Sequence, residues 1–405
     1  MDSAINTAAR ALAAGDPIAA LNQVGLREDG PGLALRGIAM AQLGEWPRAK
    51  ELLRAAARKL DREPLARARC IAAQTEVALA MRELGTSAAA LDEAIEVLDA
   101  RHDRINATHA RLLRLRRLLL LGRLDEAEAE REVLDLRAMP PMLQAYAQLV
   151  TADIAVRRVR ARAAAMALRF ARHAAALAGI GALRAEIEAT AEHLRRPAAR
   201  LRSRGRDRTL GLVEVEEILD SPALVVDACR RTVGRHRQTR SLARRPVLFG
   251  LVTALAEAWP GDVGREQLLA EVFEAEATNE SWRARLRVEI GRLRKQLGDL
   301  ATVESTPRGF GLRSFDASEV VLLVPPVDGE HAAVLALLSD GSTWSTSALS
   351  LALGVSQRTV QRALAALQRD GRVQALGRAR ALRWVAPPVS GYTTALLLPR
   401  LSAGG

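Results

Sequence analysis

The first 200 residues most strongly limit the folds open to this chain, because they combine many Ala, Leu and Arg residues with few β-branched or aromatic ones. That composition favours helices. Short breaks interrupt the pattern at Gly15-Asp16-Pro17, Gly30-Pro31-Gly32, Gly44, Gly85, Gly122 and Pro140-Pro141. We therefore expect a series of short helices joined by tight turns over residues 1–198.

Three of these breaks have the same form. The segments "LGEWPRA" (43–49), "LGTSAAA" (84–90) and "LGRLDEA" (121–127) each place Leu-Gly five residues before an Ala, and their glycines are 41 and 37 residues apart. The pattern resembles tetratricopeptide repeats, whose helix pairs turn at Leu-Gly and pack on small Ala residues. The match is best over 37–56, at Gly37, Leu43, Gly44, Ala49, Leu53 and Ala56.

An irregular α-helical domain is the alternative interpretation of this region. In either case a helical array presents an extended surface. We expect that surface to bind RNA polymerase, another protein or a peptide, or to form a homodimer.

Charge favours a polyanionic partner only through its local distribution. The chain has 59 Lys+Arg against 47 Asp+Glu, a formal net charge of +12, and only Lys50, Lys59 and Lys295 are lysines. So much Arg and Ala is typical of a GC-rich coding sequence, and the global charge is therefore weak support for nucleic-acid binding. Shorter windows differ more: residues 281–313 hold eight basic and three acidic residues, and residues 356–384 hold seven and one.

A basic stretch ends the helical region. Residues 195–208, "RRPAARLRSRGRDR", are poor in apolar side chains. This composition predicts a linker or domain edge over residues 199–220.

The segment "RARLRVEIGRLRKQLG" (283–298) predicts a helix with two distinct faces. At 100° per residue, one line holds the apolar residues Trp282, Leu286, Ile290, Leu293 and Leu297. The opposite face holds Ala284, Arg287, Val288, Gly291, Arg292 and Lys295. A face that only meets water does not need a central valine beside Ala and Gly. In a DNA groove, the small residues would allow close approach and the valine could contact a thymine methyl. The basic residues could reach phosphates or guanine edges.

The surrounding sequence predicts the remaining elements of a winged helix. Residues 223–242 alternate as small antiparallel strands do, 246–261 and 264–273 are amphipathic helices, and 300–314 form two short strands with Arg308 and Gly309 at the tip. In that fold the third helix enters the major groove and the wing lies by the backbone or the minor groove.

Over about residues 221–315 the chain resembles the OmpR/PhoB-type winged-helix domain of bacterial transcription regulators. The motifs "REQLLAEVF", "RVEIGRLRKQLG" and "TPRGFGL" resemble its second helix, recognition helix and wing. The resemblance implies contacts to double-stranded DNA from Val288, Arg292, Arg294 and Arg308, and the outward face adds Arg287 and Lys295. Ala284, Gly291 and Glu289 depart from the residues that the family often carries, so the preferred DNA sequence is left open, and no receiver domain is found.

Residues 330–385 predict a second reader of DNA. The segment "STSALSLALGVSQRTVQRALAALQRDG" reads as helix, turn, helix, with Ser356 as N-cap and Val360, Leu364 and Leu367 facing inward. It resembles the helix-turn-helix plus wing of many small bacterial repressors. The DNA contacts expected here are Arg358, Thr359, Gln361 and Arg362 on the helix and Arg378 and Arg380 on the wing. A winged helix used for protein contacts is the alternative, and the Val/Leu runs at 320–326 and 393–399 are expected to pair as flanking strands.

No catalytic constellation stands out. The six histidines, His102, His109, His173, His193, His236 and His331, are scattered, and neither an HExxH motif, a Cys/His cluster nor a P-loop occurs. We therefore expect no enzyme activity, no metal and no cofactor. Cys70 and Cys229 imply no disulfide framework, and neither a signal peptide nor an apolar stretch long enough for a bilayer occurs, which favours a cytoplasmic, nucleoid-associated protein without membrane contact.

Together these features predict a mainly α chain with a tetratricopeptide-like helical array (1–198), a basic linker or edge (199–220), a winged helix (221–316) and a second winged helix-turn-helix with flanking strands (317–405). The leading hypothesis is a sequence-specific, DNA-binding transcriptional regulator. A protein–protein adaptor that uses the same surfaces without binding DNA is the alternative. Nucleic-acid processing would require a metal or nucleophile constellation that the sequence lacks.

Overall fold

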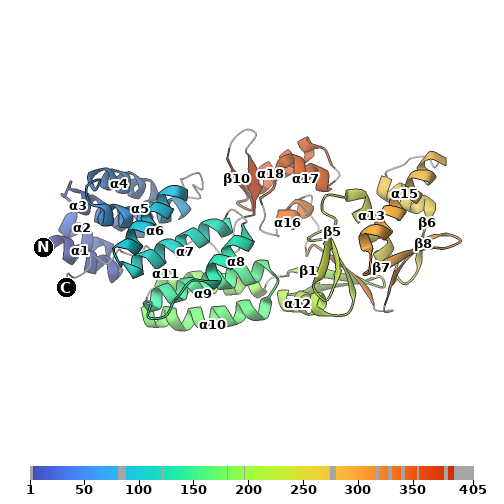
Figure 1. Cartoon of the computed structure of the whole chain (residues 1–405), viewed down its shortest axis with the longest axis horizontal. Helices are drawn as coiled ribbons and strands as arrows, with labels where there is room; N and C mark the ends of the chain where they lie inside the picture. Colours follow the sequence, from blue (N-terminus) through green and yellow to red (C-terminus); the bar gives the residue numbers. More distant parts are fainter. Residues whose placement is uncertain are drawn as a thin grey trace. The chain divides into compact units, whose positions relative to one another are not determined.

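A computed structural model describes residues 3–80, 88–120, 123–179, 181–195, 197–273, 280–315, 319–326, 331–338, 343–353, 355–377 and 382–386. The described chain is mainly helical, with a small mixed β content (Figure 1). It divides into two compact units: a helical unit (Met1–Ile154 and Ala163–His193) and a mixed unit (Ala155–Arg162 and Leu194–Pro387). None of the described helices combines the length and the apolar character that crossing a bilayer requires.

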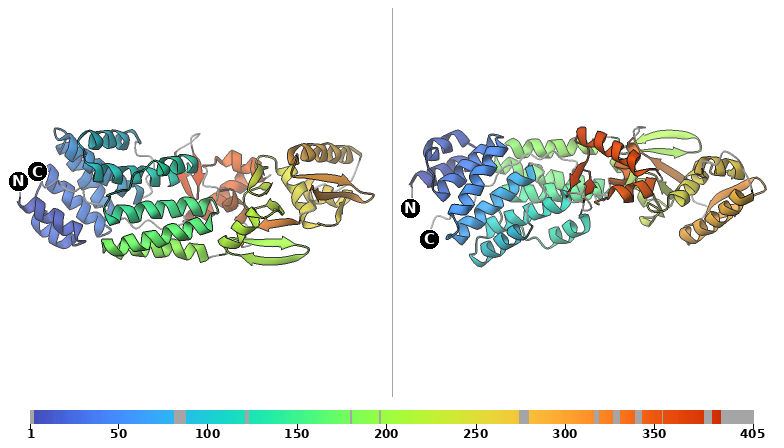
Figure 2. Two further views of the ribbon diagram at one scale, coloured as in Figure 1. Left: turned by 60° about the horizontal axis from the view of Figure 1, so that its bottom comes forward. Right: turned by 90° about the horizontal axis from the view of Figure 1, so that it is seen from above.

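Consecutive helices of the helical unit pack on one another from α1 to α8 (Figures 1 and 2). These helices are α1 (Ser3–Ala13), α2 (Pro17–Val24), α3 (Gly30–Gln42), α4 (Trp46–Lys59), α5 (Pro64–Ala80), α6 (Ala88–Ala100), α7 (Arg104–Leu120) and α8 (Leu124–Glu132). They are followed by α9 (Pro141–Arg157), α10 (Ala161–Ala178) and α11 (Gly181–Arg195). The predicted series of short helices is confirmed.

The α3–α4 pair shows why small residues recur here. Gly44 has φ +84°, a conformation that glycine adopts without strain, and it lies in the turn between the two helices. A Cβ on Gly37 would lie 2.7 Å from Cγ of Leu53, so the absence of a side chain lets α3 and α4 approach closely. Ala49 and Ala56 are fully buried in the same contact. The other two Leu-Gly breaks, at Gly85 and Gly122, lie outside the described residues.

Charged side chains lie inside the helical unit, a feature that the sequence did not predict. Arg116 of α7 is ion-paired with Glu186 of α11, and its guanidinium lies 5.1 Å from the ring centroid of Tyr146. His109 Nε2 lies 3.3 Å from a carboxylate oxygen of Glu76. Burial, reinforced by the negative charges of Glu76 and Asp153, outweighs the attraction of Arg116 and raises the pKa of Glu186 to about 7.

A six-stranded sheet organises the mixed unit, in the order β2-β1-β9-β3-β4-β5. Its strands are β1 (Ala199–Ser203), β2 (Arg206–Leu210), β3 (Leu224–Asp227), β4 (Thr232–Arg235), β5 (Gln238–Ser241) and β9 (Val320–Val324). β3 and β9 run parallel and all other neighbours run antiparallel. The antiparallel strands expected over 223–242 are confirmed.

The sheet corrects two predictions. Residues 199–220 are not a linker: they form β1, β2 and helix α12 (Leu212–Asp220), and β2 is an outer strand of the sheet. The boundary at 317 is also wrong, because β9 pairs with β1 and β3 instead of flanking the C-terminal helices. Its expected partner segment, 393–399, lies outside the described residues.

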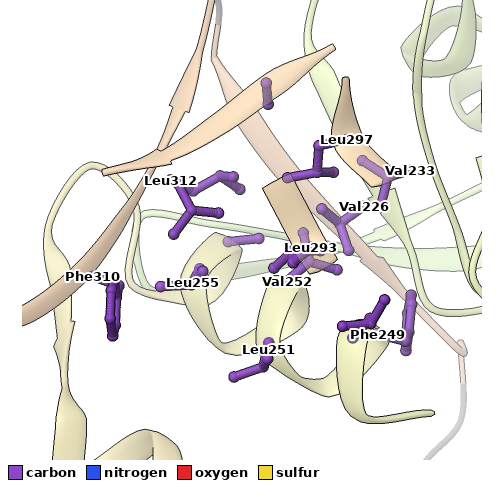
Figure 3. Close-up of a cluster of buried hydrophobic side chains, with 14 of the residues drawn as sticks. Val226, Val233, Phe249, Leu251, Val252, Leu255, Leu293, Leu297, Phe310 and Leu312 are labelled. Carbon is purple, nitrogen blue, oxygen red and sulfur yellow. The ribbon is translucent and has the colours of Figure 1, made fainter. Parts of the chain in front are cut away.

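Three helices and a small sheet follow β5. They are α13 (Pro246–Glu257), α14 (Arg265–Phe273) and α15 (Glu280–Leu297), with a three-stranded antiparallel sheet ordered β6-β8-β7 from β6 (Asp262–Gly264), β7 (Ala301–Ser305) and β8 (Gly309–Ser314). Figure 3 shows their common core, a buried cluster that includes Leu251, Val252 and Leu255 of α13 and Leu293 and Leu297 of α15. The helices expected over 246–261 and 264–273 and the hairpin over 300–314 are confirmed.

The C-terminal part of the mixed unit has its own apolar cluster. This part of the chain consists of α16 (Ala332–Leu338), α17 (Thr346–Leu353), α18 (Gln357–Arg369), β10 (Gln374–Leu376) and β11 (Arg383–Val385). β10 and β11 pair antiparallel, and the core includes Leu338, Leu349, Leu364 and Trp384. The helix-turn-helix and the following hairpin expected from the sequence are confirmed as elements.

Candidate nucleic-acid interface

Helix α15 is held in place by its apolar stripe. Leu286, Ile290, Leu293 and Leu297 are each at most 1% exposed, and Trp282 packs at the edge of the same core. The i, i+4, i+7, i+11 spacing of these four buried residues is that of one face of an α-helix, and the buried side of this helix is therefore the predicted one.

The end of α15 is fixed by two further devices. Gly298 follows the last helical residue with φ +56°, and its N–H donates to Arg294 O at 3.0 Å, which is a glycine C-terminal cap. Arg240 of β5 is ion-paired with Asp299, and its Nη1 donates to Gln296 O at 3.3 Å. A cation beside the last carbonyls of a helix is favourable. Arg240 was missed by the sequence reasoning, because nothing in "QTRSL" indicates this contact.

The opposite face of α15 is open and unusually small at its centre. Val288 is 53% exposed, and Ala284 and Gly291 are also exposed. A Cβ built on Gly291 meets no heavy atom within 4 Å, so the fold itself does not require a glycine there. Glycine in a helix interior costs about 0.5–1 kcal/mol relative to alanine. Gly291 therefore weakens the helix at a position where a larger side chain would contact nothing within the protein. Only another molecule bound to this face would meet such a side chain.

Most basic residues around this face are already ion-paired at the surface. Arg287 lies 2.6 Å from Glu280, and Arg292 lies 2.6 Å from Glu289. The Arg287–Glu280 pair is exposed on both sides and contributes only about 0–1 kcal/mol, so a phosphate can replace Glu280 at little cost. In the Arg292–Glu289 pair the arginine side chain is 64% exposed and the glutamate side chain 14%. Lys295 is exposed beside them.

Arg294 is exposed, but its guanidinium is hydrogen-bonded within the protein. Its Nε donates to Val303 O at 2.7 Å, and its Nη2 donates to Ser305 Oγ at 3.3 Å. Both acceptors belong to β7. These hydrogen bonds brace α15 against the hairpin, so we remove Arg294 from the set of groove contacts and assign it to positioning the hairpin.

The β7–β8 hairpin presents Arg308 at its tip. The Arg308 side chain is 78% exposed, and its Nη1 lies 3.8 Å from Asp262, close to the limit of an ion pair. Arg265 of α14 donates from Nη1 to Pro307 O at 2.9 Å and from Nη2 to Thr306 O at 3.0 Å. Arg265 therefore sets the conformation of the tip, a role that the sequence reasoning missed although the residue opens the quoted segment "REQLLAEVF".

Helix α18 offers a second exposed basic face. Ser356 caps the helix, since its hydroxyl accepts from Thr359 N at 3.1 Å. Val360, Leu364 and Leu367 are buried, as predicted. The predicted contact residues Arg358, Thr359, Gln361 and Arg362 are all exposed around the first turns of the helix. Arg378 and Arg380, expected on the following wing, lie outside the described residues.

Within the described ranges, no three or more His, Cys, Asp or Glu side chains are grouped so as to hold a metal ion. No protein-family model, curated protein or solved structure matches the chain. The interface is therefore defined by its own geometry alone.

Proposed function

We propose that the chain is a sequence-specific regulator of transcription that binds double-stranded DNA through the mixed unit. In this proposal residues 221–316 are a winged helix of the OmpR/PhoB type, with α15 in the major groove and the β7–β8 hairpin as the wing. The observation that supports it most strongly is the outward face of α15, where a half-exposed valine and a glycine with open space beside it are surrounded by basic side chains.

Each residue of that face has a distinct role in the proposed complex. Val288 contacts a thymine methyl, and Gly291 allows the helix backbone to approach the bases. Arg292 exchanges Glu289 for a phosphate or a guanine edge, while Lys295 contacts the backbone as a point charge. Arg308 reaches the phosphates or the minor groove from the wing tip.

The remaining parts extend this scheme. Residues 331–386 act as a second winged helix-turn-helix whose α18 reads an adjacent segment through Arg358, Thr359, Gln361 and Arg362, so that two modules cover a longer site than one. The helical unit is a tetratricopeptide-like array that receives RNA polymerase, another protein or peptide, or a second copy of the chain.

Selection of binding sites from a random duplex library with the full chain tests the proposal. We expect one enriched sequence, and anisotropy titrations should then show that affinity for it falls steeply as salt rises. Val288→Asp should abolish the sequence preference, and Arg292→Ala and Arg308→Ala should each weaken binding by about 5- to 100-fold.

Arg48→Ala is a matched control for Arg292→Ala. Arg48 is an exposed arginine of the helical unit, and like Arg292 it is ion-paired with a glutamate three residues away, Glu51, at 2.9 Å. The two arginine side chains are similarly exposed, at 57% and 64%, whereas Glu51 is 67% and Glu289 14% exposed. It should leave DNA binding unchanged. Negligible binding that does not respond to salt would instead support the adaptor, and equal losses from Arg48→Ala and Arg292→Ala would remove α15 from the interface.

A further inference from the structure

Helix α10 carries a second unusual surface, in the helical unit. Its outward side presents Met166, Phe170, His173 and Leu177, at spacings of four, three and four residues. Met166, Phe170 and Leu177 are 55%, 58% and 66% exposed. The opposite side of the same helix packs inward through Ala164, Leu168, Ala171 and Ala175, all at most 1% exposed. One stripe of α10 thus builds the fold, and the other remains uncovered within the described residues.

The spacing of the exposed stripe is that of a helix that packs on another helix. Three of its four positions are apolar, at Met166, Phe170 and Leu177, and His173 occupies the fourth. Side chains at this spacing form a straight seam, which receives the side chains of a partner helix. A helix whose outer side only meets water carries polar residues there. A full aromatic side chain buries roughly 150–250 Å² on contact, so Phe170 alone leaves on the order of 100 Å² available to a partner.

The edge of the stripe is basic. Helix α10 has Arg162, Arg169 and Arg172 and no Asp or Glu. Arg169 is exposed beside the stripe. Towards α11, Arg172 is ion-paired with Glu188 at 2.7 Å. Both residues line a hollow of about 470 Å³ together with Arg184, Ala185 and Ile187. The surface therefore combines an apolar seam with a mostly positive rim.

We propose that this face of α10, together with the neighbouring hollow, binds an amphipathic helix of another protein whose apolar seam is flanked by Asp and Glu residues. The acidic flank is required by charge, because Arg169 and Arg184 lie on the rim that the partner must cover. The assignment does not depend on DNA binding, and it gives the helical unit a partner of defined chemistry.

Two other occupants fit the surface less well. A second copy of α10 in an antiparallel pair would bring the Arg169 side chains of both copies to the centre of the contact, where like charges repel. A membrane would meet a helix without Trp or Tyr, the residues that anchor helices at a lipid interface.

Two fluorescent synthetic helical peptides with one leucine seam test the proposal on the full chain. One peptide has Glu and the other Lys at the positions that flank the seam. We expect the Glu peptide to bind at least about tenfold more tightly than the Lys peptide. Arg169→Glu should weaken the Glu peptide and strengthen the Lys peptide, a reversal that a change in fold would not produce.

Leu177→Asp and Leu26→Asp form a matched pair, since both place the same charge at an exposed leucine, and Leu26 of the helical unit is 98% exposed. Leu177→Asp should weaken the Glu peptide by about tenfold or more, and Leu26→Asp should not. Equal affinities of the two peptides, equal effects of the two substitutions, or no binding of the Glu peptide would overturn the proposal.

Two further measurements examine the other occupants. Sedimentation velocity that shows a concentration-dependent dimer in the wild type and a monomer in Leu177→Asp would assign the surface to a second copy. Co-sedimentation with phosphatidylserine vesicles that Leu177→Asp abolishes would assign it to a membrane. Either result would refute the proposal of an acidic partner helix. That proposal requires that neither dimerisation nor vesicle binding depends on Leu177.

Discussion

Replacing Gly291 by alanine should affect the stability of the protein and its affinity for DNA in opposite directions. The added methyl group meets no heavy atom within 4 Å, so the protein alone accommodates it without movement. Alanine in an exposed helix interior is more favourable than glycine by about 0.5–1 kcal/mol. Gly291→Ala should therefore stabilise α15 by that amount.

Gly37→Ala provides the opposite case in the same chain. A Cβ on Gly37 would lie 2.7 Å from Leu53 Cγ and 3.2 Å from Ala49 O, inside van der Waals contact. The helices α3 and α4 must then separate, and overpacking of this kind costs about 1–3 kcal/mol. The two substitutions make the same chemical change and should shift stability in opposite directions.

The DNA complex reverses the sign for Gly291. If the backbone of α15 lies against base edges, the new methyl group occupies space that the duplex fills, at a cost of about 1–3 kcal/mol. That cost corresponds to about 5- to 150-fold weaker binding. Gly291→Ala should therefore produce a more stable protein that binds its selected DNA site less well.

Hydrogen exchange and anisotropy measure the two effects on one sample. Amide protection of peptides that cover 280–297 should increase about two- to fivefold in Gly291→Ala, if exchange follows local opening of the helix. DNA affinity should fall in the same preparation. Unchanged affinity would place Gly291 outside the contact and refute a groove-bound α15, and lowered protection would mean that the outward face of α15 is covered within the protein.

Three sets of named contacts lead to further predictions. The pKa of Glu186 is raised to about 7 from 4.5, so its contribution to stability is complete below about pH 4.5 and is lost as pH rises through 7. Chemical unfolding at pH 5.5 and 8 should show a loss of about 2 kcal/mol that Glu186→Gln removes, and an unchanged pH dependence in that variant would contradict this expectation. Lys295→Ala should lower the slope of log affinity against log salt by about 1. Arg294→Ala should leave that slope unchanged and destabilise the hairpin by about 1 kcal/mol in denaturant melts, because the Arg294 guanidinium is bonded to β7. Equal slopes in both variants would contradict the assignment of Lys295 to DNA binding and of Arg294 to the hairpin. Glu280→Gln should raise DNA affinity about two- to fivefold by freeing Arg287, and a fall in affinity would show that Glu280 positions that arginine for binding.

Local patterns were sufficient to predict α13, α14, α15 and the β7–β8 hairpin. Each of these elements has its own periodicity or turn signal, and each buries its apolar side against its sequence neighbours. The buried residues of α15 and α18 are those that the 100° spacing indicates, and Ser356 caps α18 as expected. The outward residues of the candidate site are exposed for the same reason.

Local sequence patterns could not predict contacts between segments that are far apart in the chain. Strand β9 pairs with β1 at Arg200 and Val324, more than a hundred residues apart, and with β3 in parallel, and neither pairing leaves a local signature. The arginines of β1 and β2 suggested a solvated linker, yet Arg202 is ion-paired with Asp207 and, at 2.5 Å, with Glu257. In the helical unit, the Arg116–Glu186 pair joins helices 70 residues apart, and each residue alone is indistinguishable from a surface charge.

The position of Arg294 also shows how far helix geometry narrows the site. At about 100° per residue, Ala284, Gly291, Arg292 and Lys295 lie within roughly 60° of Val288, whereas Arg294 lies about 120° away on one flank. The structure places β7 on that flank, because Arg294 donates to Val303 O. Arg287 lies about 100° away on the same side. In the proposed complex the central face is therefore the part of α15 that contacts the groove. Arg287 lies at the edge nearer the wing, and we expect it to contact the DNA backbone.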